Sequence, residues 1–444
     1  MLGPGRLALA TPFDGLAPAT GTLAILAALR SRGWRVQHYG TRACLDDPER
    51  VRLATGLPGR HLDPWLMPPD LLRTVFGRSI GPADLAVVEG AMGAPVSLVK
   101  APFGTPGDLA PVAQALRLPA VALLPAQTID PAHLPGLDPR IEAVILDGLD
   151  PGERFDALRE GFETWSHRPL LGAVPAMPAA REALADPNEA EEALDALARG
   201  FLQTAQLGRL RSLAARAPAL GPVSDVEETC RRPFRVAYAR DDAFTRYFPD
   251  TLETLEAVGA ELVEFSPLHD ETLPAHCDLL IFGCGYTERH AEALGANLSL
   301  ILALREYVRQ GRRVYAEGGG MAYLGREIVV GGRSFPVAGV FPFVAETLLD
   351  RPRPEPVSRR LRRPTWLGPA GTLVRGYQAG RWRLTPAPGL DGPPGPSGPL
   401  TSLGDMFFHH HAIGGLVHLQ LAALPHVVSA FIHPRVPTPI NRRS

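Results

Sequence analysis

The residues that could carry out nucleophilic or metal chemistry are four cysteines and thirteen histidines. The cysteines are too few and too widely spaced for a disulfide framework or a CxxC zinc site; they are Cys44, Cys230, Cys277 and Cys284. Histidines 409–411 are consecutive, and adjacent side chains point in different directions, so we expect no physiological metal site. The glycines at 318–320 indicate a tight backbone turn rather than a phosphate loop.

The elements that must position these residues alternate along the chain. Short apolar runs bounded by Gly, Pro or charge are each followed by a helix-like stretch, which predicts parallel sheets with crossover helices. We expect strands at 6–10, 34–39, 84–90, 120–124, 142–146, 234–239, 278–283 and 312–318. We expect helices at 21–32, 70–76, 108–116 and 189–213.

The Pro-containing polar stretch before residue 233 is the best domain boundary. We therefore predict a first α/β domain at 1–215, a linker at 216–232 and a second α/β domain at 233–444. A second stretch, at 385–400, is too rich in Pro and Gly for a helix or a central strand, and the end of the chain, from Pro434 on, reads as a disordered tail.

Composition excludes several classes of function. The 45 Lys and Arg residues nearly balance 47 Asp and Glu, for a formal net charge of -2, which argues against nucleic acid as the main partner. The first fifteen residues do not have the pattern of a signal peptide and the sequence has no run of 18 apolar residues, so we expect neither a signal peptide nor a membrane span. These features predict a cytoplasmic globular protein.

Several motifs occur in a fixed order: RDDAF at 240–244, FSPLHDE at 265–271, GCGYTE at 283–288 and AEGGGMAYL at 316–324. Together they resemble the cobyrinate a,c-diamide synthases, in which similar stretches lead to a Gly-Gly-Tyr-Pro-Glu loop and a nucleophile elbow. In the first half, HLDPWLM at 61–67 and VVEGAMG at 87–93 also match. The stretches Leu-Asp-Pro-Trp and Phe-Ser-Pro-Leu-His-Asp favour this family over cobyric acid synthase, and the resemblance covers nearly the whole chain.

The resemblance implies a two-domain amidoligase of cobalamin biosynthesis. A P-loop domain resembling dethiobiotin synthetase would use Mg-ATP to activate the a and c carboxylates of a corrin. A flavodoxin-like class I glutamine amidotransferase domain would hydrolyse glutamine with a Cys-His pair and deliver ammonia. Both halves of this chain depart from the family at positions that the chemistry needs.

In the glutaminase half, the family's elbow Ala-Glu-Cys-Gly-Gly is Ala-Glu-Gly-Gly-Gly, so Gly318 occupies the position of the nucleophile. A thioester mechanism needs that thiol, a base and N–H donors for the oxyanion. The resemblance places His418 at the base position and Gly283, Gly285, Tyr286 and Glu288 in the oxyanion loop. We expect Cys284 to be a small buried residue that points elsewhere, and glutamine-dependent chemistry to be lost.

In the ATP half, the family's GKTT falls on residues 17–20, so Pro18 replaces the phosphate-binding Lys, Ala19 replaces the metal-binding Thr, and Thr20 follows. The family's metal-binding Asp is Ala43, although Asp46 lies nearby and Glu89 matches the family's acidic Mg²⁺ residue. These changes remove most of the electrostatic clamp, and we do not expect high-affinity Mg-ATP binding.

On the substrate side, only Arg375 and Gly376 remain of the family's interdomain Arg-Gly-His stretch. The sequence leaves open whether the chain is an enzyme. It favours a pseudoenzyme that binds a corrinoid or other tetrapyrrole, or that partners an active paralogue or itself as a homodimer. The alternatives are an ATP-dependent amidoligase that amidates a cobyrinate-like ring with ammonia or glutamine, and a different reaction that uses His418, Glu317 and Glu89.

Overall fold

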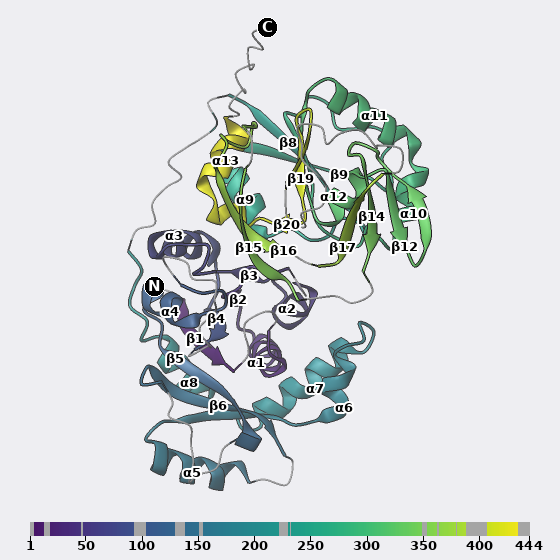
Figure 1. Cartoon of the computed structure of the whole chain (residues 1–444). Helices are drawn as coiled ribbons and strands as arrows, with labels where there is room; N and C mark the ends of the chain where they lie inside the picture. The colour runs from purple at the N-terminus through teal and green to yellow at the C-terminus, as the bar shows by residue number, and fades with distance from the viewer. Residues whose placement is uncertain are drawn as a thin grey trace. The chain divides into compact units, whose positions relative to one another are not determined.

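The computed structural model describes residues 4–12, 18–45, 48–92, 104–128, 138–150, 154–221, 230, 232–348, 353–361, 364–378, 380–387 and 406–433. It divides into two compact units, Met1–Ser224 and Asp225–Ser444. Each is described by itself (Figure 1). Within the described part of the chain, no helix is long and apolar enough to cross a membrane.

Unit 1 is built on one seven-stranded parallel sheet of order β3-β2-β4-β1-β5-β6-β7. Nearly all residues of the inner strands are buried, as expected of a parallel sheet covered on both faces. The strands are β1 (Gly5–Thr11), β2 (Val36–Gly40), β3 (Arg60–His61), β4 (Leu85–Ala91), β5 (Ala120–Pro125), β6 (Ile141–Leu149) and β7 (Leu170–Pro175).

Helices cover both faces of this sheet. The helices are α1 (Thr20–Ser31), α2 (Pro48–Thr55), α3 (Pro69–Ser79), α4 (Leu109–Leu116), α5 (Phe155–Ser166), α6 (Pro178–Ala183), α7 (Ala190–Leu202) and α8 (Leu207–Ala214), with a short 3₁₀ turn η1 (Ala126–Thr128). Helix α1 is buried continuously from Gly21 to Leu29, because it lies against the sheet with α2 and α7 beside it (Figure 1).

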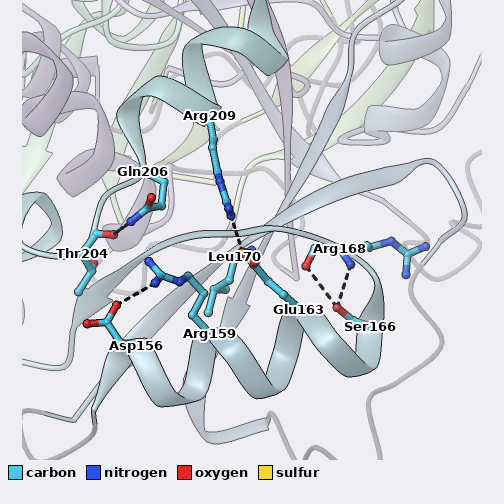
Figure 2. Close-up of polar contacts among 9 residues, drawn as sticks. All are labelled: Asp156, Arg159, Glu163, Ser166, Arg168, Leu170, Thr204, Gln206 and Arg209. Atoms are coloured by element: carbon cyan, nitrogen blue, oxygen red, sulfur yellow. Dashed lines mark hydrogen bonds and ion pairs between the residues drawn. The ribbon is translucent and has the colours of Figure 1, made fainter.

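The helix predicted over 189–213 is wrong as one element: it is two helices, α7 and α8. The chain breaks because Thr204 exchanges hydrogen bonds with the backbone of Ala173 in β7, and the Gln206 N–H donates to the Leu171 carbonyl. Glu163 of α5 then accepts from the Leu170 N–H at 3.0 Å and from Arg209 of α8 at 2.6 Å (Figure 2). Strand β7, which the sequence did not predict, is thus what interrupts the helix.

Unit 2 is built on a six-stranded sheet of order β18-β19-β11-β10-β8-β9. Its five parallel strands lie in the chain order 2-1-3-4-5, which is the flavodoxin-like arrangement. The strands are β8 (Phe234–Ala239), β9 (Ala260–Phe265), β10 (Leu279–Phe282), β11 (Arg313–Glu317), β18 (Phe407–His409) and β19 (Ala412–Gly415). The predicted fold class, a P-loop-like parallel-sheet domain followed by a flavodoxin-like α/β domain, is confirmed.

The remaining elements of unit 2 surround this sheet. Its helices are α9 (Pro249–Ala257), α10 (Ala291–Ala296), α11 (Leu298–Arg309), α12 (Gly319–Leu324) and α13 (Pro425–Ile432), with a 3₁₀ turn η2 (Leu421–Ala423). Two small sheets are formed by β13 (Arg333–Pro336), β12 (Glu327–Val330), β14 (Phe343–Thr347) and β17 (Trp382–Pro386), and by β15 (Glu355–Arg360), β16 (Leu373–Gln378) and β20 (Val417–His418). Strand β17 lies at a sheet edge, where Pro386 is tolerated; residues 388–400 and the tail from Pro434 lie outside the described residues.

Helix α11 offers a test of the core of unit 2. Leu304 is fully buried, whereas Leu302, on the same helix, is 63% exposed. We predict that Leu304→Ala lowers the free energy of unfolding by about 2–5 kcal/mol, because it leaves a cavity. Leu302→Ala is the matched control and should change stability by less than about 0.5 kcal/mol. Denaturant unfolding followed by circular dichroism measures both; equal effects would contradict this packing.

Candidate functional site

Three neighbouring strands of the unit 2 sheet place the candidate residues at one edge. Strands β10 and β11 are parallel with Phe282 opposite Ala316. Cys284 and Gly318 each lie two residues beyond this pair, so the strand register sets them side by side. Strand β19 pairs with β11 on its other side and leads, three residues later, to His418 in β20. This is the edge at which α/β sheets of this kind bind ligands.

The two side chains meet at the position that a side chain of residue 318 would fill. The Cys284 Sγ atom lies 3.0 Å from the His418 Nε2 atom. A Cβ atom added to Gly318 would lie 2.8 Å from that sulfur and 2.8 Å from that nitrogen. The Cys284 thiol therefore lies directly beside the position where the resemblance predicts the nucleophile.

The turn at Gly318 keeps the shape of a nucleophile elbow. Gly318 has φ 50° and ψ -113°, a conformation that side chains rarely adopt, and its N–H donates to the Gly415 carbonyl at 2.9 Å. The next turn is equally tight, since a Cβ atom on Gly320 would lie 2.2 Å from the Phe282 carbonyl oxygen. Residues 318–320 thus form a strand-to-helix turn between β11 and α12.

The expectation that Cys284 points away from this site is wrong. Its loop follows the strand adjacent to the elbow, and its side chain is directed at His418, the residue that the resemblance gives as the base. Cys284 is 4% exposed, so it is indeed a small buried residue near a strand end. What the sequence comparison missed was the parallel register between β10 and β11, which brings positions 284 and 318 together.

The buried environment keeps this pair uncharged at neutral pH. Burial raises the pKa of the Cys284 thiol well above its usual value, and Glu317 adds to the effect. Burial, with the positive charges of Arg246 and Arg381, lowers the pKa of His418 to about 4. The resting pair is a thiol facing a neutral imidazole, in which the ring nitrogen can accept the proton.

Glu317 is held behind the elbow by two donors. Its Oε1 atom accepts from the Tyr315 hydroxyl at 2.5 Å and from the Leu419 N–H at 3.1 Å. Burial nevertheless raises the pKa of Glu317 to about 7, because these two hydrogen bonds only partly offset desolvation. Glu317 thus holds the backbone at the residue after His418.

The predicted oxyanion loop packs tightly against the segment 243–247. A Cβ atom on Gly285 would lie 2.0 Å from the Ala243 carbonyl oxygen, and the Gly283 N–H donates to the Tyr247 hydroxyl. The Gly283 N–H is therefore committed within the protein. The backbone of Gly319, at the start of α12, acts against burial to lower the pKa of the Cys284 thiol.

Three arginines surround Tyr286 of this loop. The guanidinium carbons of Arg246, Arg289 and Arg381 lie 4.7, 4.3 and 5.5 Å from the ring centroid. Arg246 also donates to the Tyr286 hydroxyl at 2.7 Å, and Arg381 pairs with Glu288 at 3.2 Å. The arginines thus form a cluster of positive charge around this loop, near the thiol, which the motifs did not predict.

The predicted substrate residues lie on the strand next to His418. Arg375 and Gly376 belong to β16, which pairs with β20 so that Tyr377 faces His418. A Cβ atom on Gly376 would lie 2.2 Å from the His418 carbonyl oxygen, so this glycine permits the close approach of the two strands. Arg375 is half-buried one residue before it.

In unit 1, Glu89 is fully engaged by the protein itself. Its Oε1 atom accepts from the Ala19 N–H at 2.9 Å and from the Thr22 hydroxyl at 2.7 Å, and its Oε2 atom lies 2.9 Å from His38 Nε2. Glu89 and His38 are both 3% exposed. The carboxylate of Glu89 therefore occupies the start of α1, where a P-loop protein would receive a phosphate.

The other residues predicted for the ATP site do not supply a free ligand for phosphate or Mg²⁺ among the described side chains. Pro18 and Ala19 precede α1 without an amine or hydroxyl, and Thr20 is its first residue. The Ala43 N–H donates to the buried carboxylate of Asp63 at 3.0 Å. Asp46 lies outside the described residues. The described side chains therefore do not fit Mg-ATP: Pro18 offers no cation and Ala19 no hydroxyl, and Glu89 is already bound by Ala19, Thr22 and His38.

The histidine triplet does not assemble a metal site within the described residues. His409 ends the edge strand β18, and its ring packs against that of His410 at 4.5 Å between centroids. Across the parts of the chain that the structure describes, no three His, Cys, Asp or Glu side chains are grouped so as to hold a metal ion.

Comparison with known proteins agrees with this architecture. Residues 235–378 match the family model of the CobB/CobQ-like glutamine amidotransferase domain. A cobyrinate a,c-diamide synthase of Syntrophotalea carbinolica is 32% identical over 391 residues, which cover 84% of this chain and 85% of the relative. The same enzyme of Salmonella typhimurium is 29% identical over 83% of this chain and 84% of its own length. A solved glutamine amidotransferase structure, 16% identical, covers 44% of this chain and 96% of its own, with a TM-score of 0.31.

The flavodoxin-like sheet with its elbow, and the match over 235–378, define unit 2 as a glutamine amidotransferase-like domain. The relatives extend beyond this domain, over more than four-fifths of the chain. The chain belongs to the cobyrinate a,c-diamide synthase family, as its motifs predicted.

We predict that the contact at position 318 couples it to Cys284. Gly318→Ala should lower the free energy of unfolding by about 1–3 kcal/mol, because its Cβ atom meets Sγ and Nε2 at 2.8 Å. In the double variant with Cys284→Gly the sulfur is gone, so the two costs should fall short of additivity by about 0.5–3 kcal/mol. Chemical denaturation of the four proteins of the cycle measures this, and additive costs would contradict the contact.

Glu317 predicts a pH dependence of stability. Its pKa is about 7 in the folded protein and 4.5 ordinarily, so the folded state keeps a proton that the unfolded state releases in between. Its contribution therefore falls as pH rises from about 4.5 to 7 and stays low above that. Relative to wild type, Glu317→Gln should gain stability over this window, by up to about 1.4 kcal/mol per pH unit. Guanidinium titrations from pH 4 to 8 measure the difference, and a flat difference would contradict burial of this carboxyl.

Proposed function

We propose that this chain is a corrinoid-pathway protein that binds a cobyrinate-like tetrapyrrole and does not carry out ATP-driven amidation. The observation that carries the proposal is the engagement of Glu89. An ATP-dependent ligase needs a free anion site at the start of α1 and an acidic group free to hold Mg²⁺. Here the Glu89 carboxylate occupies the anion site at the start of α1, and the same hydrogen bonds make it unavailable to Mg²⁺.

The surrounding charges support the same conclusion. A phosphate placed beside the Glu89 carboxylate would experience like-charge repulsion in a buried setting, where the penalty is large. Lys100 is the only lysine in the sequence, and the family's P-loop lysine is Pro18 here. Reorganising the Glu89 network would also leave the Ala19 N–H, the Thr22 hydroxyl and His38 without their acceptor.

Binding of a macrocycle is supported by how much of the family's chain is retained. Similarity covers both units, so the fold that would shape a macrocycle site is preserved. Arg375, which the family resemblance assigns to the substrate, suits a corrin carboxylate because a guanidinium makes bidentate hydrogen bonds to such a group. Such a protein would act by holding the tetrapyrrole, or by partnering an active paralogue.

The test is to incubate the purified full chain with cobyrinate, Mg-ATP and excess ammonium, and to follow the macrocycle by mass spectrometry. Ammonium bypasses glutamine, so the assay reports only on carboxylate activation. We expect no change, while the Salmonella typhimurium relative, run as a positive control, lowers the mass by about one unit per amidation, the difference between a hydroxyl and an amino group on the acyl carbon. Such a fall with this chain would overturn the proposal and make it an ATP-dependent amidoligase.

Absorbance titration of cobyrinate measures the binding itself. We predict saturable binding that Arg375→Ala weakens by about tenfold, the loss of one charge-assisted hydrogen bond of roughly 1.4 kcal/mol. Arg360→Ala, on the neighbouring strand β15 and exposed, is the matched control and should bind as wild type does. Absence of saturable binding would refute the tetrapyrrole assignment whatever the amidation assay gives.

A further inference from the structure

The Cys284–His418 pair goes beyond the proposed function, because it needs neither ATP nor a tetrapyrrole. A thiol and an imidazole at 3.0 Å form the pair that nucleophilic acyl transfer requires. Both side chains lie at the carboxyl edge of the unit 2 sheet, beside a preserved strand-to-helix elbow that itself carries no side chain. The Cys284 thiol therefore contacts the same histidine that the resemblance pairs with a nucleophile at position 318, although Cys284 follows the adjacent strand.

We propose that Cys284 is a relocated nucleophile, and that with His418 it hydrolyses the side-chain amide of a small amino-acid amide such as glutamine. The position of the catalytic thiol would thus have moved from residue 318 to residue 284. Loss of the Cβ atom at 318 is what makes room for this arrangement, since that atom would lie 2.8 Å from the sulfur.

The reaction balances with water as the only co-reactant. The proton of the Cys284 thiol passes to His418 Nε2 while Sγ forms a bond to the amide carbon. The C–N bond then breaks, and the leaving nitrogen takes the proton from His418 and departs as ammonia. A water molecule, deprotonated by His418, attacks the resulting thioester, the C–S bond breaks, and the sulfur recovers the proton. The net change is amide plus water to carboxylate plus ammonium.

The surroundings bear on the first of these steps, the transfer of the thiol proton. Burial raises the pKa of the Cys284 thiol, whereas Arg246, the Gly319 backbone and Arg381 act to lower it, so these three groups favour negative charge as it develops on the sulfur. Burial, with the positive charges of Arg246 and Arg381, lowers the pKa of His418 to about 4, so the imidazole that faces the thiol is neutral. A neutral base receives the thiol proton during attack, so no preformed thiolate is required.

Glu288 is the second observation that points to a ligand. Its Oε1 atom pairs with Arg381, while its Oε2 atom is buried without a hydrogen-bond partner among the described residues. Arg381 also donates to the Gly285 carbonyl, which ties Glu288 to the residue after Cys284. A free carboxylate oxygen at this place accepts an ammonium group, as an amino-acid amide offers and a plain amide does not.

The experiment measures ammonia released from L-glutamine by the purified full chain without ATP or tetrapyrrole, together with capture of the thiol by a glutamine-shaped diazoketone. We expect glutamine-dependent ammonia release that Cys284→Ala abolishes and that His418→Asn lowers by at least tenfold. Mass mapping should find the adduct on Cys284. Cys277→Ala removes a buried cysteine that donates to the Ala275 carbonyl and should leave both readouts unchanged.

The double variant Gly318→Cys with Cys284→Gly controls for folding and for the site, because it returns the thiol to the elbow and vacates the space beside it. If it releases ammonia while wild type releases no more than Cys284→Ala, the thiol at 284 only fills space and the proposal is overturned. If neither protein is active and the diazoketone leaves Cys284 unmodified in wild type, the proposal is also overturned. Succinamide offers an amide without an ammonium group. If wild type releases ammonia from glutamine and not from succinamide, the result supports the role of Glu288 in binding the ammonium group.

Discussion

Position 318 has no room for a side chain, and the arrangement of unit 2 around the site follows from that constraint. Sulfur and ring nitrogen each lie 2.8 Å from where a Cβ atom would stand, closer than such atoms approach in proteins. The glycine also removes the strain that φ 50° would impose on any other residue. A thiol at 284 and a side chain at 318 therefore exclude one another, and only one of them can face His418 at a time.

Much of the fold could be predicted from the sequence, because buried parallel strands are continuous apolar runs bounded by Gly or charge. The runs that became β1, β4, β8 and β11 are of this kind. The wrong predictions have a common cause, which is hydrogen bonding between segments that are distant in the sequence. The helix predicted over 189–213 is interrupted because Thr204 and Gln206 bond to β7, which lies some thirty residues earlier, and no local propensity encodes those bonds.

The same contrast between local sequence pattern and contacts of distant segments holds for the candidate site. Motif order indicates which positions matter, and it identified Gly318, His418 and Glu89. It says nothing about which side chains the sheet brings together. Cys284 belongs to a different loop from the elbow, so the motifs give no reason to place it there, yet the pairing of Phe282 with Ala316 fixes it beside Gly318. His38 and Thr22 likewise match no motif, and they matter because β2 pairs with β4 and α1 begins beside it, so that both reach Glu89.

The two sites are built in a physically similar way: in each, a buried group from a neighbouring element occupies the space or the donors where the resemblance predicts another group. The Cys284 sulfur stands next to the missing side chain of residue 318, and the Glu89 carboxylate takes the N–H and hydroxyl donors at the start of α1. Restoring one family residue alone is then opposed by the group that replaced it. A thiol at 318 meets the sulfur of Cys284, and a lysine at 18 would leave the Glu89 carboxylate on the same donors. At each site the cost of a single substitution falls on buried, satisfied partners, so we expect a change of its chemistry to require paired substitutions.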